Sequence, residues 1–400
     1  MKRQTRTGIV LGLAGGLTMM GLGMSSWAKG GPNGAQPPQQ QVQAKRPIDP
    51  AQLPDGDRIQ IAILLDTSSS MDGLIEQAKS QLWRVVNEFA TAKRQGKRPR
   101  LEIALYEYGK SSLPAGGGFI RQIVPFTRDL DRVSEELFAL RTNGGEEYAG
   151  LVIQDATRDL AWSKDVADLK LVFIAGNEGF DQGPVAFREA IAGAKSRGIV
   201  INTIYCGSAE DGIAPLWREG ASLAAGSYTT IDQNTKVATI ATPYDAELAR
   251  LSGELNKTYV GYGRHGADKK ARQEKQDENA QAVGQAAAPE RAVSKAGGGY
   301  DNGDWDIVDA QKGGKSVAEL REEELPAEMK GMTLDQRKAF VAAKSAERDR
   351  IQKRIRELDG QRRQFIAAEQ KKAPKGASTL DRAVNDMVHQ NAEAVGYSFE

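Results

Sequence analysis

The chain has 400 residues, which is enough for two or three domains and for at least one full hydrophobic core. Its 54 Lys and Arg residues are balanced by 53 Asp and Glu residues, so the formal net charge is +1. This balance excludes a strongly basic protein that binds nucleic acid through its overall charge. Cys206 is the only cysteine, which excludes an intramolecular disulfide.

The N-terminus has the pattern of a secretory signal peptide. Basic residues within the first six positions precede an apolar run broken by glycines, and small residues lie two apart at Ser26 and Ala28. This pattern predicts that residues 1–28 are removed and that the mature chain is exported, either to the periplasm or out of the cell. The alternative is an uncleaved membrane anchor, because the run has about the length of a membrane span. After cleavage we expect no stable membrane span.

Residues 29–57 are rich in Pro, Gln and Gly and have no apolar periodicity, which predicts a flexible linker. Over residues 58–262, short apolar runs alternate with segments whose apolar residues recur every three or four positions. This alternation predicts an α/β fold, with a doubly wound and mostly parallel sheet covered by helices on both faces. Residues 119–127 follow the preceding strand after a short Gly-rich connection, so we expect them to form an antiparallel edge strand.

The composition changes after residue 262. Residues 263–316 are charged and poor in large apolar residues, which predicts a low-complexity linker. Within them, the segment around Trp305 carries a short apolar patch and is predicted to dock, either onto the main domain or onto a partner.

The last part of the sequence is predicted to be mainly helical. In residues 317–372, Thr333 begins a capping box at the start of a long helix, and apolar residues follow a heptad seam. Arg348 and Arg362 fall on the same seam, so we expect a helical hairpin or a weak coiled coil that binds a partner. Residues 373–400 are predicted to form an amphipathic tail helix. These C-terminal helices would be a second interaction surface.

Asp66 and the hydroxyl residues that follow it raise the central question about function. Asp66 ends an apolar run, and Thr67, Ser68, Ser69 and Ser70 come directly after it. A helix cap at Ser70 or Asp72 would account for only one or two of these oxygens. A second interpretation is a nucleophilic serine, and a third is a metal site.

A serine nucleophile needs a base, which is most often a histidine. The chain has only His265 and His389, and both lie outside the predicted α/β unit. No G-x-S-x-G elbow surrounds Ser68 or Ser70. A cell-envelope hydrolase that uses one of these serines, with a lysine base, is therefore the least favoured interpretation.

The metal interpretation uses the predicted geometry best. At the carboxyl end of a central parallel strand, Asp66, Ser68 and Ser70 would point at the crevice where α/β sheets bind ligands. Carboxylate and hydroxyl oxygens suit Mg²⁺, which prefers six oxygen ligands and keeps several waters.

The D-x-S-x-S turn of Asp66, Ser68 and Ser70, together with the order of strands and helices around it, resembles the von Willebrand factor type A (VWA) domain. The resemblance covers residues 58–262, and the overall arrangement is similar to exported bacterial proteins that join such a domain to a helical tail. It implies a metal-ion-dependent adhesion site that holds Mg²⁺, or alternatively Mn²⁺ or Ca²⁺. It also implies a protein partner whose acidic side chain completes the coordination.

Two other parts of the family's metal site differ in this chain. The family usually has a Thr in a loop before a later helix, where this chain offers Glu146 or Glu147. The family also has an Asp in a T-D-G turn after the fourth strand. Here Gly176 takes that position, so Asn177 or Glu178 would have to substitute. Either the site is rebuilt with an extra acidic ligand, which favours metal but weakens its attraction for a carboxylate, or metal binding is lost.

The sequence therefore predicts an exported, non-enzymatic binding module that contacts a protein partner and does not bind nucleic acid. The first alternative is a scaffold protein whose VWA domain binds partners without metal, and the second is the serine hydrolase. The complete set of predicted metal ligands is Asp66, Ser68, Ser70, Glu146, Glu147, Asn177 and Glu178.

Overall fold

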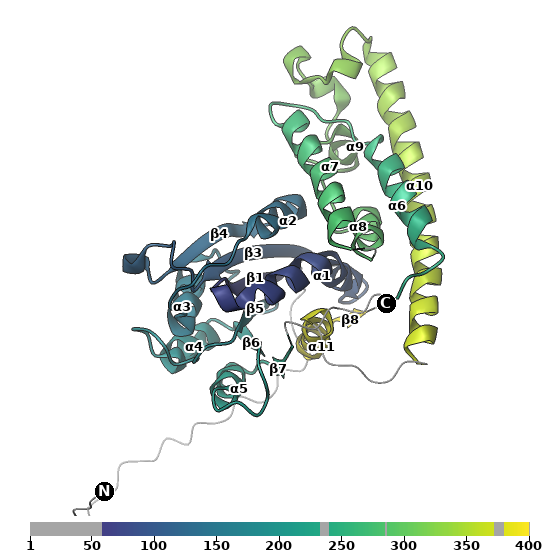
Figure 1. Cartoon of the computed structure of the whole chain (residues 1–400). Coiled ribbons are helices and arrows are strands. Elements are labelled where there is room, and N and C mark those ends of the chain that lie inside the picture. The colour runs from purple at the N-terminus through teal and green to yellow at the C-terminus, as the bar shows by residue number, and fades with distance from the viewer. Residues whose placement is uncertain (1–57, 233–239, 285, 372–379, 400) are drawn as a thin grey trace, which may run out of the picture. The chain divides into compact units, whose positions relative to one another are not determined.

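The computed structural model describes residues 58–232, 240–284, 286–371 and 380–399 (Figure 1). The predicted signal peptide and the first linker lie outside the described residues. In the part of the chain that is described, no helix is both long enough and apolar enough to cross a membrane.

The centre of the fold is a six-stranded sheet with the strand order β4-β3-β1-β5-β6-β7 (Figure 1). All neighbouring strands are parallel except β3 and β4, which pair antiparallel. The strands are β1 (Arg58–Asp66), β3 (Arg100–Tyr108), β4 (Ile120–Thr127), β5 (Leu169–Gly176), β6 (Val200–Tyr205) and β7 (Tyr228–Thr230). Pro125 in β4 cannot donate a ladder hydrogen bond, which suits the edge position. The predicted α/β class and its antiparallel edge strand are confirmed.

Helices cover both faces of the sheet because its central strands are apolar on both sides. Every residue of β5 is buried. One face packs against α1 (Asp72–Thr91) and α2 (Leu130–Ala139). The other packs against α3 (Ala149–Asp159), α4 (Phe187–Ser196) and α5 (Ala214–Leu223). The sheet is therefore doubly wound, with two apolar cores.

The predicted tail helix is α11 (Leu380–Glu393), and it packs against α1. Its apolar side chains Val384, Met387 and Val388 are buried in the same core as those of α1. After α11, the short strand β8 (Ser398–Phe399) pairs antiparallel with β2 (Ala92–Lys93), which directly follows α1. The end of the chain thus completes the helical cover of the sheet.

Residues 263–316 differ from the predicted low-complexity linker, because they contain three helices. These are α7 (Gly266–Val283), α8 (Ala287–Ala296) and α9 (Ile307–Lys312). Buried charge pairs hold them in place where apolar residues are few. Arg291 and Lys295 of α8 are fully buried and pair with Asp277 of α7 at 2.9 and 2.6 Å. Apolar periodicity does not detect a helix that is fixed by such pairs.

The predicted docking segment packs onto its own chain. Trp305, Ile307 and Val308 are buried, and the Trp305 ring stacks on Tyr259 with centroids 5.8 Å apart. The backbone N–H of Ile307 donates to the carbonyl of Val260 at 3.0 Å. Of the two predicted docking targets, the structure therefore shows the intramolecular one.

Residues 317–371 contain one long helix, where the sequence predicts a helical hairpin or a weak coiled coil. Three short 3₁₀ turns precede α10 (Leu334–Gln370), which packs against α8, α9 and the earlier helix α6 (Asp245–Asn256). The predicted capping box is present, since the Thr333 N–H donates to Gln336 at 2.8 Å and the Gln336 N–H donates back to the Thr333 hydroxyl at 3.3 Å.

The charged residues on the predicted α10 seam have partners within the chain. Arg348 is fully buried and binds Asp306 at 2.6 Å and Asp309 at 2.7 Å. Arg362 binds Asp245 and Glu290. The seam that suggested a coiled coil therefore faces acidic groups of this same chain.

Candidate metal and partner site

The strand order places a crevice at the carboxyl ends of β1 and β5. The chain leaves β1 toward β3 on one side and later returns to β5 on the other side. Connections that leave neighbouring parallel strands in opposite directions open a ligand crevice between them. β1 ends at Asp66 and β5 ends at Gly176. The D-x-S-x-S turn and residues 177–178 therefore flank the same crevice.

Asp66 is fully buried at the base of this crevice. Its Oδ1 accepts a hydrogen bond from the Ser68 N–H at 2.7 Å. Among the described residues, no group donates a hydrogen bond to its Oδ2. Burial, with a contribution from the negative charge of Glu147, raises the pKa of Asp66 to about 7. An oxygen of this kind is suited to a cation, because a buried carboxylate without a counter-charge is costly.

The serine hydroxyls lie beside this carboxylate. Ser68 Oγ and Ser70 Oγ are 3.0 Å apart, and Ser70 Oγ donates to Asn177 Oδ1 at 3.2 Å. Ser68 is buried, whereas Ser70 is exposed. The N-cap residue of α1 is Met71, which makes no side-chain capping bond, so neither Ser70 nor Asp72 takes the predicted cap position. The helix-cap interpretation therefore does not explain these hydroxyls.

Glu147 is the residue of the 146–147 pair that turns inward. It is 9% exposed, whereas Glu146 is exposed. A Cβ placed on Gly109 would lie 2.7 Å from Glu147 Cγ and 2.8 Å from Asp66 Oδ1, so both side chains flank this one point. Burial, followed by the negative charge of Glu178, raises the pKa of Glu147 to about 7.

The remaining predicted ligands lie at the rim. Asn177 receives the bond from Ser70, and Glu178 Oε2 accepts a hydrogen bond from the Gln182 side chain at 3.3 Å. Both side chains are half-buried. The structure thus brings Asp66, Ser68 and Glu147 into the interior of the site and leaves Glu146 and Glu178 at its edge.

Two site residues at the end of β3, Tyr108 and Gly109, are absent from the sequence prediction. Tyr108 is fully buried, and its hydroxyl donates to the carbonyl of Ala175 at 3.1 Å. A Cβ on Gly176 would lie 2.6 Å from the Tyr108 hydroxyl and 3.1 Å from Asp66 Oδ2. A side chain at Gly176, where the resemblance implies an Asp, would therefore meet the Tyr108 hydroxyl. Tyr108 lies opposite Asp66 in the parallel pairing of β1 with β3, so a prediction of this pairing could have placed Tyr108 in the site.

The donor set fits a hard divalent cation. It offers a carboxylate oxygen without a donor on Asp66, a second buried carboxylate on Glu147, and the hydroxyls of Ser68 and Ser70. Oxygen ligands of this type, completed by water, suit Mg²⁺, Mn²⁺ or Ca²⁺. Among the described residues, no three His, Cys, Asp or Glu side chains form a metal-binding group by themselves.

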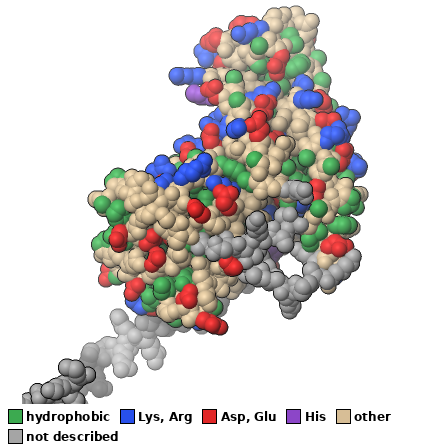
Figure 2. All heavy atoms as spheres, viewed as in Figure 1, with side chains coloured by type: hydrophobic (Ala, Val, Ile, Leu, Met, Phe, Trp, Pro, Cys, Tyr) green, Lys and Arg blue, Asp and Glu red, His purple; other side chains and the backbone are tan. Residues whose placement is uncertain are grey.

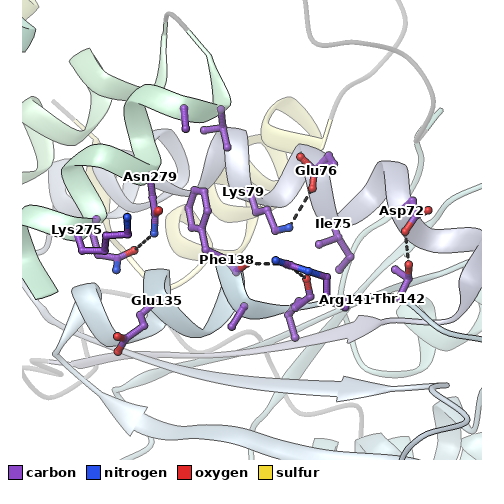
Figure 3. A pocket seen from close by; sticks show the side chains of 15 residues that line it. Asp72, Ile75, Glu76, Lys79, Glu135, Phe138, Arg141, Thr142, Lys275 and Asn279 are labelled. Atoms are coloured by element: carbon purple, nitrogen blue, oxygen red, sulfur yellow. Dashed lines mark hydrogen bonds and ion pairs between the residues drawn. The ribbon is translucent and has the colours of Figure 1, made fainter.

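A separate cavity of about 860 Å³ lies between α1, α2 and α7 (Figure 3). Its charged side chains have partners: Lys79 binds Glu76 at 3.0 Å, and the Thr142 hydroxyl donates to Asp72. Arg141 donates to carbonyl groups at the end of α2. Its lining contains none of the predicted ligands.

The two histidines lie on other parts of the fold. His265 precedes α7. His389 belongs to α11, where it contacts Glu88 and stacks on Phe399 with centroids 3.8 Å apart. Neither position offers Ser68 or Ser70 a histidine base.

No known protein family matches the chain, and no curated protein matches it. Solved structures that match include the SpRpn10 VWA domain, with 16% identity, 45% of this chain and 91% of that chain covered, and a TM-score of 0.34. The pilus adhesin SpaC from Lactobacillus rhamnosus GG has 12% identity over 45% of this chain and 28% of its own, with a TM-score of 0.34. Proximal thread matrix protein 1 from the mussel byssus has 14% identity over 44% and 42% of the two chains, with a TM-score of 0.33.

This chain spans less than half of the length of the mussel protein and of the adhesin.

Without metal, the domain should lose stability as the pH rises. The pKa of Asp66 is raised from 3.8 to about 7, so the folded state binds a proton that the unfolded state releases. The stabilising effect of this proton is complete below about pH 4 and disappears as the pH rises through about 7. We expect the free energy of unfolding in chelator to fall by about 2–4 kcal/mol across this window.

Chemical denaturation at a series of pH values tests this expectation. Asp66→Asn should make the profile less steep, because the amide carries no proton that titrates. The remaining slope should come from Glu147, whose pKa is also raised to about 7. Glu323→Gln, which removes an exposed carboxylate outside the crevice, should leave the profile unchanged. A wild-type profile parallel to that of Asp66→Asn would contradict the assignment.

Proposed function

We propose that this protein is a VWA-type binding module that contacts a protein partner through a divalent metal ion in the β1–β5 crevice. The observation that carries the proposal is the convergence of a buried, unpartnered Asp66 oxygen with the hydroxyls of Ser68 and Ser70 at the strand-order switch point. Glu147 supplies a second carboxylate in the position where the resemblance implies a Thr.

In this proposal, Asp66 and Glu147 would hold the ion, and the two serine hydroxyls would complete its protein ligands. The ion, when bound, would supply a Lewis-acidic centre for one oxygen of the partner. Tyr108 shapes the back of the site, since its hydroxyl lies where a side chain at Gly176 would point. Ser70 and Asn177 are hydrogen-bonded across the crevice and would orient the rim toward the partner.

We propose further that the protein is exported and has no enzymatic activity. Export rests on the basic and apolar pattern of residues 1–28. The absence of enzymatic activity is proposed because the candidate serines are part of a carboxylate and hydroxyl cluster, without a histidine base among the described residues around them. The periplasm and the cell exterior both fit this sequence pattern.

A metal-free scaffold is the second candidate function. It is favoured by one observation, namely that a side chain at Gly176, where the resemblance implies an Asp, would meet the Tyr108 hydroxyl. In that case the Asp66 and Glu147 carboxyl groups would each be about half protonated near pH 7, because burial raises the pKa of each to about 7.

Neighbouring glutamates provide a matched test of metal binding. We expect Glu147→Gln to weaken Mg²⁺ binding at least about tenfold in calorimetry, because it removes a ligand charge without changing shape. Glu146→Gln should change the affinity by less than about threefold, because that side chain is exposed. Asp66→Ala should abolish binding.

The same variants separate the two candidate functions. If the wild type takes up no metal and Glu147→Gln raises the melting temperature equally with and without chelator, the metal-free scaffold is correct. If Glu146→Gln weakens binding as much as Glu147→Gln, the assignment of Glu147 as the inner ligand is wrong.

A further inference from the structure

The loops at the carboxyl edge of the sheet are strongly acidic, although the whole chain is nearly neutral. Five of these loops lie wholly within the described residues, namely 67–73, 109–119, 141–148, 177–186 and 206–213. Their acidic residues are Asp72, Glu146, Glu147, Glu178, Asp181, Glu210 and Asp211, and their basic residues are Lys110 and Arg141. By contrast, Figure 2 shows acidic and basic side chains interspersed over the face in view, as expected for a net charge of +1.

Both basic residues of these five described loops are already engaged. Lys110 pairs with the buried Glu107 at 3.7 Å, and Arg141 donates to the carbonyls of Phe138 and Leu140. Most of the acidic side chains, including Glu146 and Asp181, are exposed. These loops therefore carry seven acidic residues against two basic ones. Arg188 of α4 also interacts with Asp181, but its guanidinium pairs with Glu219 at 2.6 Å. The loops thus present a net negative charge.

A metal ion would not reverse this sign. The charges of Asp66 and Glu147 already equal that of one divalent ion, so Glu146 and Glu178 remain as surplus negative charge beside it. Glu178 is close enough to raise the pKa of Glu147. A carboxylate from a partner would lie close to these negative charges. The repulsion would lower its affinity and disfavour acidic partners.

We propose that the partner of this site is a basic protein segment, with Lys or Arg side chains that pair with Glu146 and Glu178. Such a segment would place a neutral oxygen, such as a backbone carbonyl, over the crevice. This proposal rests on the partner-binding function proposed above. It differs from the expectation that an acidic side chain of the partner completes the site.

Two synthetic peptides of equal length, one repeating Lys-Gly-Ser and one repeating Glu-Gly-Ser, test the charge preference. Fluorescence anisotropy with the full mature chain, at about 0.1 M salt and with Mg²⁺ present, should show at least about tenfold tighter binding of the lysine peptide. The double variant Glu146→Lys with Glu178→Lys should remove this preference. The matched double variant Glu319→Lys with Glu323→Lys, at exposed positions outside the edge, should change binding by less than about twofold.

The proposal is overturned if the glutamate peptide binds more tightly, if the lysine peptide does not bind, or if both double variants weaken it equally. The last result would indicate attraction to overall charge alone. Repeating the titration with chelator separates this proposal from the metal site. Lysine-peptide binding that persists without metal, in a chain that takes up no Mg²⁺, would overturn only the metal dependence. Tight metal-dependent binding of the glutamate peptide would overturn only the basic partner.

Discussion

Replacing Arg291 with alanine should lower the free energy of unfolding by about 3–5 kcal/mol. Arg291 of α8 is fully buried and binds Asp131 of α2 at 2.6 Å and Asp277 of α7 at 2.9 Å. Its guanidinium also lies 4.2 Å from the centre of the Trp83 ring of α1. Removing it would leave Asp131 without a counter-charge in a dry interior, and it would leave Asp277 with Lys295 as its remaining cation.

The charges around Arg291 show why the loss should be large. Burial raises the pKa of Asp131, and Arg291 opposes this rise. Burial would also raise the pKa of Asp277, but Lys295 and Arg291 hold it below its usual value. The Tyr300 hydroxyl donates to Asp131 at 2.5 Å and accepts from Arg291 at 3.2 Å. Asp131 thus depends on a cation that alanine cannot replace, and Asp277 would keep one of its two cations, Lys295.

Arg158 offers a matched control with similar geometry and opposite exposure. It binds Asp159 through two contacts of 2.6 and 2.7 Å, but its side chain is 59% exposed. Arg158→Ala should therefore cost less than about 1 kcal/mol. Urea denaturation of both variants measures the difference. Equal losses would show that the Arg291 network does not stabilise the docked helices beyond an ordinary surface pair.

This network also explains which part of the fold the sequence could not predict. Hydropathy indicates β1 and β5, because a strand buried on both faces is a continuous apolar run. It does not indicate α7, whose residues are mostly charged or polar and whose position depends on ion pairs with α8. In the sequence, a charged residue that is buried in the fold cannot be distinguished from one that is exposed to solvent. Its ion-pair partner comes close only in the tertiary fold.

The candidate site also has some residues that the sequence predicts and others that it does not. Asp66, Ser68 and Ser70 lie within five consecutive residues, so one motif and its placement after a strand are sufficient to predict them. Tyr108 reaches the site only because β3 pairs in parallel with β1, opposite Asp66. The choice of Glu147 over Glu146 depends on which side chain the loop turns inward, and two adjacent glutamates carry no signal for that choice.

Residues 58–262 should not form a stable monomer when they are produced alone. The sequence predicts an independent domain with these bounds, because the alternation of strands and helices ends there. In the structure, the apolar core on the α1 face continues without a break into α6, α8, α10 and α11. Of these helices, only α6 lies within the fragment. Leu248, Leu251 and Leu255 of α6 are buried, and α6 packs against α8 and α10.

In the fragment, exposing each of these leucine side chains would cost about 1.5–3 kcal/mol of stabilising free energy. The apolar side chains of α1 would also lose the cover of α8 and α11. We therefore expect the fragment to aggregate or to melt well below a chain of residues 58–400, measured by calorimetry with size-exclusion chromatography. Adding residues 263–400 as a separate chain should restore the melting temperature, because it returns α11, β8 and the Arg291 network to their places. A monomeric fragment with the melting temperature of the longer chain would contradict this prediction. In that case the α/β domain would be stable without α7 to α11, and the Arg291 network would only attach these helices to it.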